Sequence, residues 1–524
     1  MHEAHEMKNR LAGLARARRM VPTGAAIGLA AALAAGCAAG PDYRRPEAAA
    51  PAAFREAEGW RLASPADDDP TRWWTRYGDA LLTELADSVR VSNQNVAAAE
   101  AAWRQAQAAL SAARAPLFPT VSATVSESRS RSASGSFATT TGTTTLPGGV
   151  GTVGTVGGVG TVGGTTATTS STAFLTGIDR AALTASWQLD LWGGLRRQVE
   201  SSAAGVQASR ADLGAALLSA QATLVQSYLQ LRAIDAQRRL LDDGAAAFAR
   251  TLQLTRDRYE AGVAQRTDVT QAQTQFESAR AASADLGVQR AQLEHAIAML
   301  VGRTPASLSI EPAAALPPLP AMPQALPSTL LERRPDVAAA ERRVAAANAQ
   351  VGVAQAAFFP TLVLNATGGY QGRTFSDLLS LPNRFWSLGP TLAAAVFDGG
   401  LRRAQRTQAQ AAYEVTVAQY RQTVLTAIQQ VEDDLAALRL IEVELRFQRV
   451  AAESAARTLE LTLEQYRFGT VSYLNVVTAQ TASLNAEQSL ANATGRQLVA
   501  SAALMRDLGG DWVAAERAAG GGAR

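Results

Sequence analysis

Apolar residues recur at intervals of three and four along two long stretches of the chain, 195–258 and 401–465. Leu224, Val225 and Tyr228 illustrate the spacing, and both stretches are rich in Ala, Gln, Leu and Arg and contain no Pro. This periodicity predicts two amphipathic α-helices, each about 95 to 100 Å long at 1.5 Å per residue. Such lengths exceed any single globular core. The many Ala residues at contact positions favour close antiparallel packing, as in a coiled-coil tube.

Shorter helices are predicted beside the long ones. Segments 267–299 and 473–506 follow the long helices after brief breaks, and segment 328–358 follows a stretch, 305–327, that contains seven Pro residues. Because proline fixes φ and lacks an N–H donor, 305–327 is predicted to be a non-helical linker. Stacked end to end, 267–299 and 328–358 would match one long helix, at about 96 Å.

Four short segments alternate apolar and polar residues with a period of two, the pattern of strands with one apolar and one polar face. They are 121–126, 183–191, 362–367 and 391–396, and Pro390 weakens the last of these assignments.

Four strands cannot close a barrel, and an isolated hairpin is unstable in water, so strands from several copies are expected to combine. A soluble sandwich of two hairpins is the alternative. Aromatic residues near the strand ends favour an outer-membrane barrel; they are Phe118, Trp187, Trp192, Phe359, Tyr370, Phe385 and Trp386.

The chain contains an internal duplication. Three motifs recur in the same order: Phe-Pro-Thr at 118 and 359, Gly-Gly at 193 and 399, and Tyr-x-x-Gly at 259 and 466. The first offset is 241 residues and the second is 206, so the first copy carries 35 extra residues between these motifs. They fall in a Thr- and Gly-rich tract, 132–172, predicted to be a long exposed loop.

These landmarks divide the chain into a first repeat, 73–327, and a second repeat, 328–510. An N-terminal segment, 37–72, precedes the repeats, and a flexible tail, 511–524, follows them.

The N-terminus resembles an export signal. Residues 1–36 hold an Arg-rich stretch and then a short apolar run that ends directly before Cys37, as in a bacterial lipoprotein signal. Cleavage there would leave Cys37 to carry lipid, and Ala38 after it, by resemblance to known lipoproteins, favours sorting to the outer membrane. An ordinary signal peptide with an incidental Cys is the alternative. After Cys37 no apolar run is long enough for a transmembrane helix.

Charge and composition exclude several functions. The first 36 residues carry five basic and two acidic side chains, which leaves 44 of each sign in the remainder and no net field for nucleic acid. That remainder has one His, His295, and one Cys, which excludes internal disulfides and His/Cys zinc sites. No phosphate-binding Gly-Lys-Ser/Thr loop occurs. We expect no catalytic residues, metal or cofactor, and an enzyme is the least favoured class.

Several motifs carry a family resemblance. Gly40-Pro41-Asp42-Tyr43-Arg44-Arg45-Pro46, Leu331-Glu332-Arg333-Arg334-Pro335-Asp336, Phe358-Phe359-Pro360, Phe397-Asp398-Gly399-Gly400 and the two Tyr-x-x-Gly breaks occur in order. Together they resemble the TolC/OprM outer membrane factors, specifically the lipoproteins of the NodT branch.

The resemblance implies an α+β membrane protein. It predicts a homotrimer with one 12-stranded β-barrel, four strands per chain, continued by a long α-helical barrel with an equatorial mixed region. Such a protein is a passive exit duct of a tripartite efflux system, extending from the outer membrane into the periplasm. The resemblance also implies its partners, which would be outer-membrane lipid, a periplasmic adaptor and an inner-membrane pump of the resistance-nodulation-division type.

The turns that end the long helices are the predicted docking and gating sites, because helix length places them farthest from the barrel. The adaptor-docking turns are Gly262 with Val263, and Gly469 with Thr470. Gly262 and Gly469 are expected to supply a positive φ. The strand-to-helix turns are assigned to Gly193, Gly194, Gly399 and Gly400.

By resemblance, the periplasmic constriction involves Asp268, Asn475, Tyr466 and Tyr259. Three copies of Asp268 near a three-fold axis would attract cations, and Asn475 stands where relatives often have Asp. Relatives also hold the closed turn with an Arg that is Val471 here. The alternatives are a helix-start acid for Asp268 and plain helix packing for the two tyrosines.

Two other classes of function fit the same pattern. An outer-membrane exit component of type I protein secretion shares this fold and would have an ABC exporter as its partner. A lipid-anchored periplasmic coiled coil without a pore is the second. The transported substrate cannot be deduced, because a duct need not recognise what it conducts.

Overall fold

The computed structural model describes residues 39–48, 51, 53–57, 70–132, 174–313, 315–320 and 334–510. The signal segment 1–36, Cys37, nearly all of the predicted loop 132–172, the end of the Pro-rich linker and the tail 511–524 lie outside these residues. The chain forms two compact units. Residues 115–191 and 359–396 form a sheet unit, and the remaining described residues form a helical unit.

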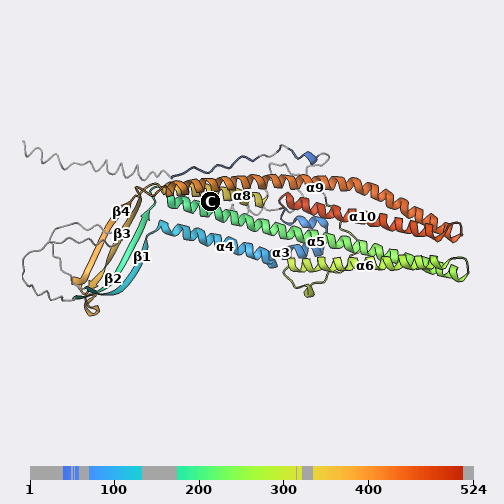
Figure 1. Cartoon of the computed structure of the whole chain (residues 1–524), viewed down its shortest axis with the longest axis horizontal. Helices are drawn as coiled ribbons and strands as arrows, with labels where there is room; N and C mark the ends of the chain where they lie inside the picture. The colour runs from blue at the N-terminus through green and yellow to red at the C-terminus, as the bar shows by residue number, and fades with distance from the viewer. Residues whose placement is uncertain are drawn as a thin grey trace, which may run out of the picture. The chain divides into compact units, whose positions relative to one another are not determined.

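The helical unit consists of two long helices and five shorter ones in the part of the chain described (Figure 1). The long helices have 67 residues each, about 100 Å at 1.5 Å per residue, and two of the shorter ones have 35 residues each. Equal lengths in the two repeats agree with an internal duplication. The helices are α3 Ala80–Ser92, α4 Gln94–Arg114, α5 Gly194–Glu260, α6 Arg266–Leu300, α8 Pro335–Ala356, α9 Leu401–Arg467 and α10 Tyr473–Asp507.

The shorter helices pack along the long ones. Helices α4, α6 and α8 contact α5, whereas α8 and α10 contact α9. Between Ser201 and Ala211 the buried side chains of α5 are small, and they include Ala204 and Ala208. Small side chains let helix backbones approach closely over a long contact, as the sequence pattern predicts. Larger residues fill the middle of the unit, where Trp73, Tyr77 and other buried apolar side chains form the main core.

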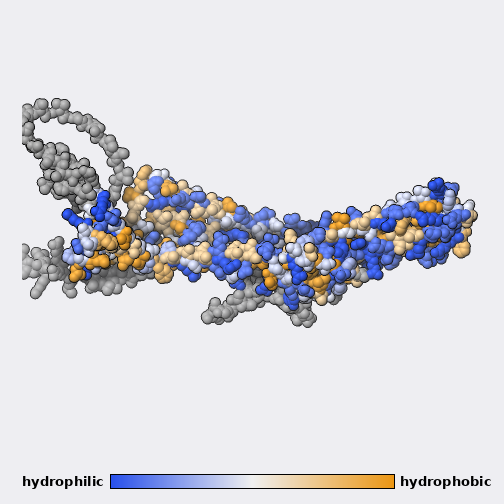
Figure 2. Space-filling view, turned by 90° about the horizontal axis from the view of Figure 1, so that it is seen from below, coloured by the Kyte–Doolittle hydropathy of each residue, from blue (hydrophilic) through white to orange (hydrophobic). Residues whose placement is uncertain are grey.

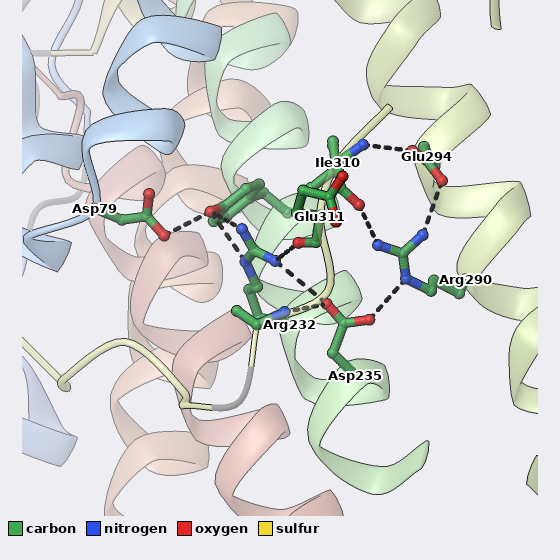
Figure 3. A network of polar contacts seen from close by, with 9 residues as sticks. Asp79, Arg232, Asp235, Arg290, Glu294, Ile310 and Glu311 are labelled. Carbon is green, nitrogen blue, oxygen red and sulfur yellow. Dashed lines mark hydrogen bonds and ion pairs between the residues drawn. The ribbon is translucent and has the colours of Figure 1, made fainter. Parts of the chain in front are cut away.

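A buried polar network fastens α3 to α5 (Figure 3). The Tyr228 hydroxyl on α5 donates to Asp79 Oδ2 at 2.5 Å, and Asp79 Oδ1 accepts the Leu82 N–H as the N-cap of α3. Arg232 donates to the Tyr228 oxygen through Nε at 3.0 Å and Nη2 at 2.7 Å. Burial, with the bond to Asp79, raises the pKa of Tyr228 well above its usual range, so this hydroxyl stays protonated.

The same network holds the first part of the Pro-rich linker. Arg232 donates to the Glu311 carbonyl oxygen at 2.7 Å, and the Ile310 N–H donates to Glu294 at 2.6 Å. Between them, Asp235 pairs with Arg232 at 3.3 Å and with Arg290 at 2.7 Å (Figure 3). Side chains from two helices thus satisfy backbone groups that a non-helical segment would otherwise bury without partners.

The sheet unit is one four-stranded antiparallel sheet in the order β1-β2-β3-β4. Its register places Val121 opposite Ala185, Ala185 opposite Ala366, and Ala366 opposite Leu388. Because side chains alternate between faces, this row and its neighbours two residues away share one apolar face. The strands are β1 Thr120–Ser132, β2 Phe174–Leu189, β3 Thr361–Gly372 and β4 Arg384–Ala393.

The opposite face of the sheet is polar. The Ser186 hydroxyl bonds the Asn365 side-chain oxygen at 3.0 Å, and the Thr367 and Thr184 hydroxyls lie 3.5 Å apart. On the apolar face, by contrast, Leu183 is 60% exposed and Trp386 is 75% exposed. Figure 2 shows apolar surface gathered over the strands. Among the described residues of one chain, no element covers this apolar face.

The strands differ in detail from the sequence prediction. The two predicted hairpins are joined by β2–β3 pairing into one sheet, which is not a sandwich. The second strand ends at Leu189 rather than 191, and the fourth ends at Ala393, before the fully exposed Val396. Pro390 lies within β4, opposite Leu364. Proline has no N–H, so β4 lacks one backbone donor at this position.

Candidate functional site

The strand-to-helix turns are built by glycine and, in the second repeat, by a carboxylate. Gly193 has a φ of +76° directly before α5, whose first residue is Gly194. Gly399 and Gly400 have φ of +62° and +89° before α9. Asp398 Oδ1 accepts the Gly400 N–H at 3.0 Å. Positive φ at these positions lets the chain turn from extended strand into helix without a side-chain clash.

The N-terminal segment is fastened near the start of α5. The Ala39 N–H donates to the Trp192 carbonyl oxygen at 2.9 Å, and the buried Arg197 guanidinium donates to Ala39, Gly40 and Asp42 oxygens. Farther along, the Tyr43 hydroxyl donates to Glu341 on α8 at 2.6 Å. Two residues before Ala39 the sequence has Cys37, which lies outside the described residues.

The turn between α5 and α6 is a Schellman motif. The Gly262 N–H donates to the Tyr259 carbonyl oxygen at 2.9 Å, and the Val263 N–H donates to the Arg258 carbonyl oxygen at 2.9 Å. Gly262 has the positive φ of +75° that this motif needs. No atom lies within 4 Å of a Cβ placed on Gly262. The turn therefore depends on glycine for its backbone conformation and leaves open space beside it.

The turn between α9 and α10 repeats this geometry. The Gly469 N–H donates to the Tyr466 carbonyl oxygen at 3.0 Å, the Thr470 N–H donates to the Gln465 carbonyl oxygen at 3.0 Å, and Gly469 has a φ of +76°. In each Tyr-x-x-Gly motif, the tyrosine carbonyl thus receives the glycine N–H. The Tyr-x-x-Gly motif is therefore the sequence signature of the cap that ends each long helix.

The two turns touch through one arginine. Arg258, near the end of α5, donates from Nη1 to the Tyr466 carbonyl oxygen at 3.0 Å. Its guanidinium carbon lies 4.7 Å from the centre of the Tyr466 ring, a cation–π contact. Tyr466 is only 3% exposed, whereas its counterpart Tyr259 is 45% exposed. The duplicated tyrosines therefore occupy different environments, one inside the packing of the turns and one on the surface.

A small apolar cluster lies behind the turns. The Tyr466 and Tyr473 rings lie 5.6 Å apart, and both are buried with Leu252, Ala272 and Val476. Burial raises the pKa of Tyr473 to about 12, and Tyr466 and the Asp268 carboxylate push it in the same direction.

Asp268 and Asn475 both stand at the third residue of their helices. Asp268 Oδ2 accepts the Gln265 N–H at 3.1 Å and forms a capping box at the start of α6. Asn475 is exposed, and its N–H donates to the Ser472 carbonyl oxygen at 3.2 Å. The capping geometry shows that Asp268 stabilises its own helix start. It leaves open a second role for this partly exposed carboxylate.

The tip of each turn presents apolar surface. Val263 is 65% exposed and Phe468 is 84% exposed, on either side of the glycines, and Leu474 is 59% exposed at the start of α10. Thr470 is exposed beside Phe468. An exposed apolar cluster at helix turns is typical of a protein contact rather than of a solvated end.

The sequence prediction missed two residues at these turns. Arg258 precedes the first tyrosine directly, and Tyr473 begins α10. The sequence signal for both residues was a difference between the two repeats. When the repeats are aligned, Gln465 stands at the position of Arg258, and Arg266 stands at the position of Tyr473. Which residue Arg258 contacts depends on packing between the two repeats, and periodicity does not report it.

Among the described residues, no group of three or more His, Cys, Asp or Glu side chains could hold a metal ion. No helix in this part of the chain combines the length and the apolar character that crossing a membrane requires.

Comparison with known proteins identifies the family. Residues 85–303 and 326–510 match the family described as outer membrane efflux protein. The pyoverdine export outer membrane protein OpmQ of Pseudomonas aeruginosa is 30% identical over 458 residues, which cover 86% of this chain and 90% of OpmQ. The probable efflux pump outer membrane protein TtgC of Pseudomonas putida is 29% identical over 481 residues, which cover 91% of this chain and 93% of TtgC.

Solved structures show the same fold. The outer-membrane channel OprN superposes with a TM-score of 0.80 at 29% identity, covering 91% of this chain and all of OprN. VceC of Vibrio cholerae superposes with a TM-score of 0.72 at 25% identity, and the match covers 84% of this chain and 99% of the VceC chain.

Paired long helices with a four-stranded sheet are thus the fold of outer membrane channel subunits. The chain belongs to the TolC/OprM family of outer membrane efflux proteins, which confirms the resemblance seen in the sequence. This is a family of channels.

Proposed function

We propose that three copies of this chain form a passive exit channel in the outer membrane for small molecules expelled from the cell. The observation that carries the proposal is the sheet, which has one apolar face, one polar face and two edges that no described strand of the same chain pairs with. In lipid an open edge leaves backbone groups without partners, so the edges of β1 and β4 need strands from other copies. Closure with the apolar face outward gives a lumen lined by Ser, Thr and Asn.

The surface of α9 supports assembly with further copies. Leu440, Phe447 and Leu461 are 58%, 72% and 43% exposed, and they lie seven and fourteen residues apart. A heptad spacing of apolar residues is the contact stripe of a coiled coil. Since α9 leaves this stripe exposed in the single chain, a helix of a neighbouring subunit is its expected partner.

The channel is proposed to work with a periplasmic adaptor and an inner-membrane pump of the resistance-nodulation-division type. The sequence has no phosphate-binding loop, and a passive duct needs an energised partner. Gly262 with Val263, and Gly469 with Thr470, are the proposed docking turns. Their support is the exposed apolar surface at the tip, which suits the tip of another helical hairpin.

The same turns are the proposed gate. Tyr466 would position the second turn, and Asp268 with Asn475 would set the charge of the entrance, with one carboxylate per subunit. Tyr259, half exposed at the end of α5, would contact whatever lies beside the first turn.

Small molecules are the proposed cargo, and no enzymatic activity is proposed. The relatives are described as exporting pyoverdine or as efflux pump components. No described feature of this chain favours protein secretion over efflux.

Cys37 is the proposed lipid attachment site. The proposal is supported by the hydrogen bond from the Ala39 N–H to the carbonyl oxygen of Trp192, the third residue after β2. This bond holds the N-terminal segment beside the strand-to-helix turn. A Cys37→Ser variant should therefore lose the mass of the acyl chains. An intact mass that differs from wild type only by the exchange of sulfur for oxygen would show that Cys37 is not modified.

The proposed function is tested by the conductance of the purified protein in planar lipid bilayers. Discrete single-channel steps are expected. Stable insertion without conductance would contradict a channel and favour the anchored coiled coil.

A further inference from the structure

A hollow lies on the sheet, toward the end of the strands that is far from their connections to the helices. It measures about 580 Å³ and is lined by residues of all four strands, most of which belong to the apolar face. Gly368 on β3 lies in its middle, between Leu183 on β2 and Trp386 on β4, its two neighbours in the register. We refer to this feature as the sheet hollow.

The space over Gly368 depends on the absence of a side chain. A Cβ placed on Gly368 would have one atom within 4 Å, the Phe385 carbonyl oxygen at 4.0 Å. On the next residue, Gly369, a Cβ would lie 2.2 Å from the Ala181 carbonyl oxygen. Close backbone packing therefore requires glycine at 369 but not at 368. At Gly368 the sheet leaves room that another molecule can fill.

A cation without a partner stands at the outer end of the sheet hollow. Arg384 is the exposed first residue of β4 and lies opposite Tyr370, about 7 Å along the strands from the row of Gly368. Among the described residues, none forms an ion pair with its guanidinium. Arg129, on the same face, pairs with Glu127 at 2.7 Å.

The remaining carboxylate near this end of the apolar face does not offer surface charge to Arg384. Asp179 lies in the row beyond Tyr370, opposite Glu127, and is only 3% exposed. The outer end of the sheet hollow therefore presents an unneutralised guanidinium beside apolar surface (Figure 2). This combination is complementary to an anion that carries an apolar chain.

The direction of the strands fixes how such a molecule would lie in the membrane. Strands β1 and β3 lead away from helices that extend into the periplasm, so Arg384 lies toward the outer leaflet. A guanidinium on a lipid-facing surface costs least at headgroup level, and its planar fork matches phosphate oxygens. Tyr370 and Trp386 are the aromatic residues expected at that level. From Arg384 the hollow continues toward the bilayer centre, as an acyl chain does from its headgroup.

We propose that the sheet hollow binds a phosphate-bearing lipid of the outer leaflet. One acyl chain lies over Gly368, between Leu183 and Trp386, and the phosphate pairs with Arg384. The inference rests on the proposed function, because it requires the apolar face of the sheet to point into the membrane. It assigns a specific lipid to each subunit, in addition to the general contact of a barrel with lipid.

Native mass spectrometry of the purified trimer with added lipid A tests the site. Wild type should bind up to three molecules of lipid A per trimer, about tenfold more tightly than lipid A stripped of its phosphates, because the guanidinium–phosphate pair is charge-assisted. In Arg384→Gln this preference should disappear, while affinity for the dephosphorylated lipid stays as in wild type. Gly368→Leu fills the hollow and should weaken binding of both lipids.

Arg180→Gln is the matched control, because it removes a cation from the opposite face of the sheet. The Arg180 guanidinium carbon lies 4.7 Å from the centre of the Phe385 ring, and its loss should leave both lipid affinities unchanged. The thermal stability of each trimer is measured in parallel, since a purely structural defect would not remove the preference for phosphate alone. Should Gly368→Leu fail to assemble, Gly368→Val adds a smaller side chain that strands favour.

A wild-type preference for lipid A in Arg384→Gln would overturn the site, as would undiminished lipid binding by an assembled Gly368→Leu or Gly368→Val trimer. Conductance of the same preparations separates this inference from the proposed function. A conducting wild-type channel without preference for lipid A over its dephosphorylated form would overturn the lipid site alone. A protein that does not conduct would overturn the proposed function.

Discussion

Asp268 and Asn475 occupy the same position, the third residue of α6 and of α10, in the two halves of the duplicated chain. Only the first is charged, and its carboxylate also caps its helix by accepting the Gln265 N–H. If these positions face the entrance, a trimer carries three carboxylates there instead of six. The difference makes the charge of the entrance adjustable by a single substitution in either repeat.

Asp268→Ala should weaken block of the channel by multivalent cations, whereas Asn475→Asp should strengthen it, because carboxylates in a constriction attract cations. The measurement is the concentration of hexaamminecobalt(III) that halves the conductance in planar bilayers. Asp257→Ala is a suitable control, since this exposed carboxylate accepts from Gln253 on α5. Equal block in wild type and both variants would remove Asp268 and Asn475 from the constriction.

Gly262→Leu should abolish drug resistance in cells while the trimer still forms. Leucine at a φ of +75° costs about 1–2 kcal/mol locally and places a bulky side chain on the proposed docking turn. Unlike Gly469, this position has no neighbour within 4 Å, so Arg258 is left undisturbed. The readout is crosslinking to the adaptor in intact cells.

Gly205→Ala, within α5 and also without neighbours, is the control and should keep resistance. Wild-type crosslinking by Gly262→Leu would contradict a docking role for this turn.

Leu183→Arg and Thr184→Arg distinguish the two faces of the sheet. Leu183 lies on the apolar face, where an arginine at the bilayer midplane costs about 2–4 kcal/mol, so the amount of assembled trimer in the outer membrane should fall. Thr184 lies on the polar face opposite Ser122 and Thr367. Its variant should assemble normally and shift ion selectivity toward anions. The reverse outcome would mean that the apolar face lines the lumen.

The raised pKa of the Asp434 carboxyl group should make the stability of the protein depend on pH. Burial, together with the neighbouring Asp507 carboxylate, raises the pKa of Asp434 to about 8. Because this folded-state pKa exceeds that of the unfolded chain, the folded protein binds the proton more tightly. The stability contributed by Asp434 is therefore present in acid and is lost as pH rises through about 8.

The thermal midpoint of the assembled protein should accordingly decline between about pH 4 and pH 8, and Asp434→Asn should reduce that slope. Asp433→Asn removes an exposed carboxylate that contributes least to the raised pKa of Asp434, so it should change the slope less than Asp434→Asn does. Identical slopes in all three proteins would show that Asp434 titrates normally.

The helices could be predicted closely because their ends are marked by local chemistry. Gly-Gly and Tyr-x-x-Gly motifs bracket α5 and α9, and the structure places their ends within about two residues of the predicted ones. The apolar and polar strand faces likewise follow from a period of two. Such signals lie within a few residues of the feature that they determine.

Tertiary partners could not be predicted in the same way. The pairing of β2 with β3, and the contact of Arg258 with Tyr466, each join residues from different repeats. Both depend on how two pieces of chain pack, which a periodic pattern does not record. Duplication gave one indirect clue, because positions that differ between the repeats, such as 258 and 465, are where equivalent turns acquire different contacts.

The mass of the detergent-extracted protein tests the central claim most directly, because the sheet of one chain has too few strands to close. Light scattering with correction for bound detergent should give three times the mass of one processed subunit, as a single stable species. A monomeric mass in a detergent that preserves the fold would contradict the account, since one chain would then have to satisfy both open edges of its sheet alone.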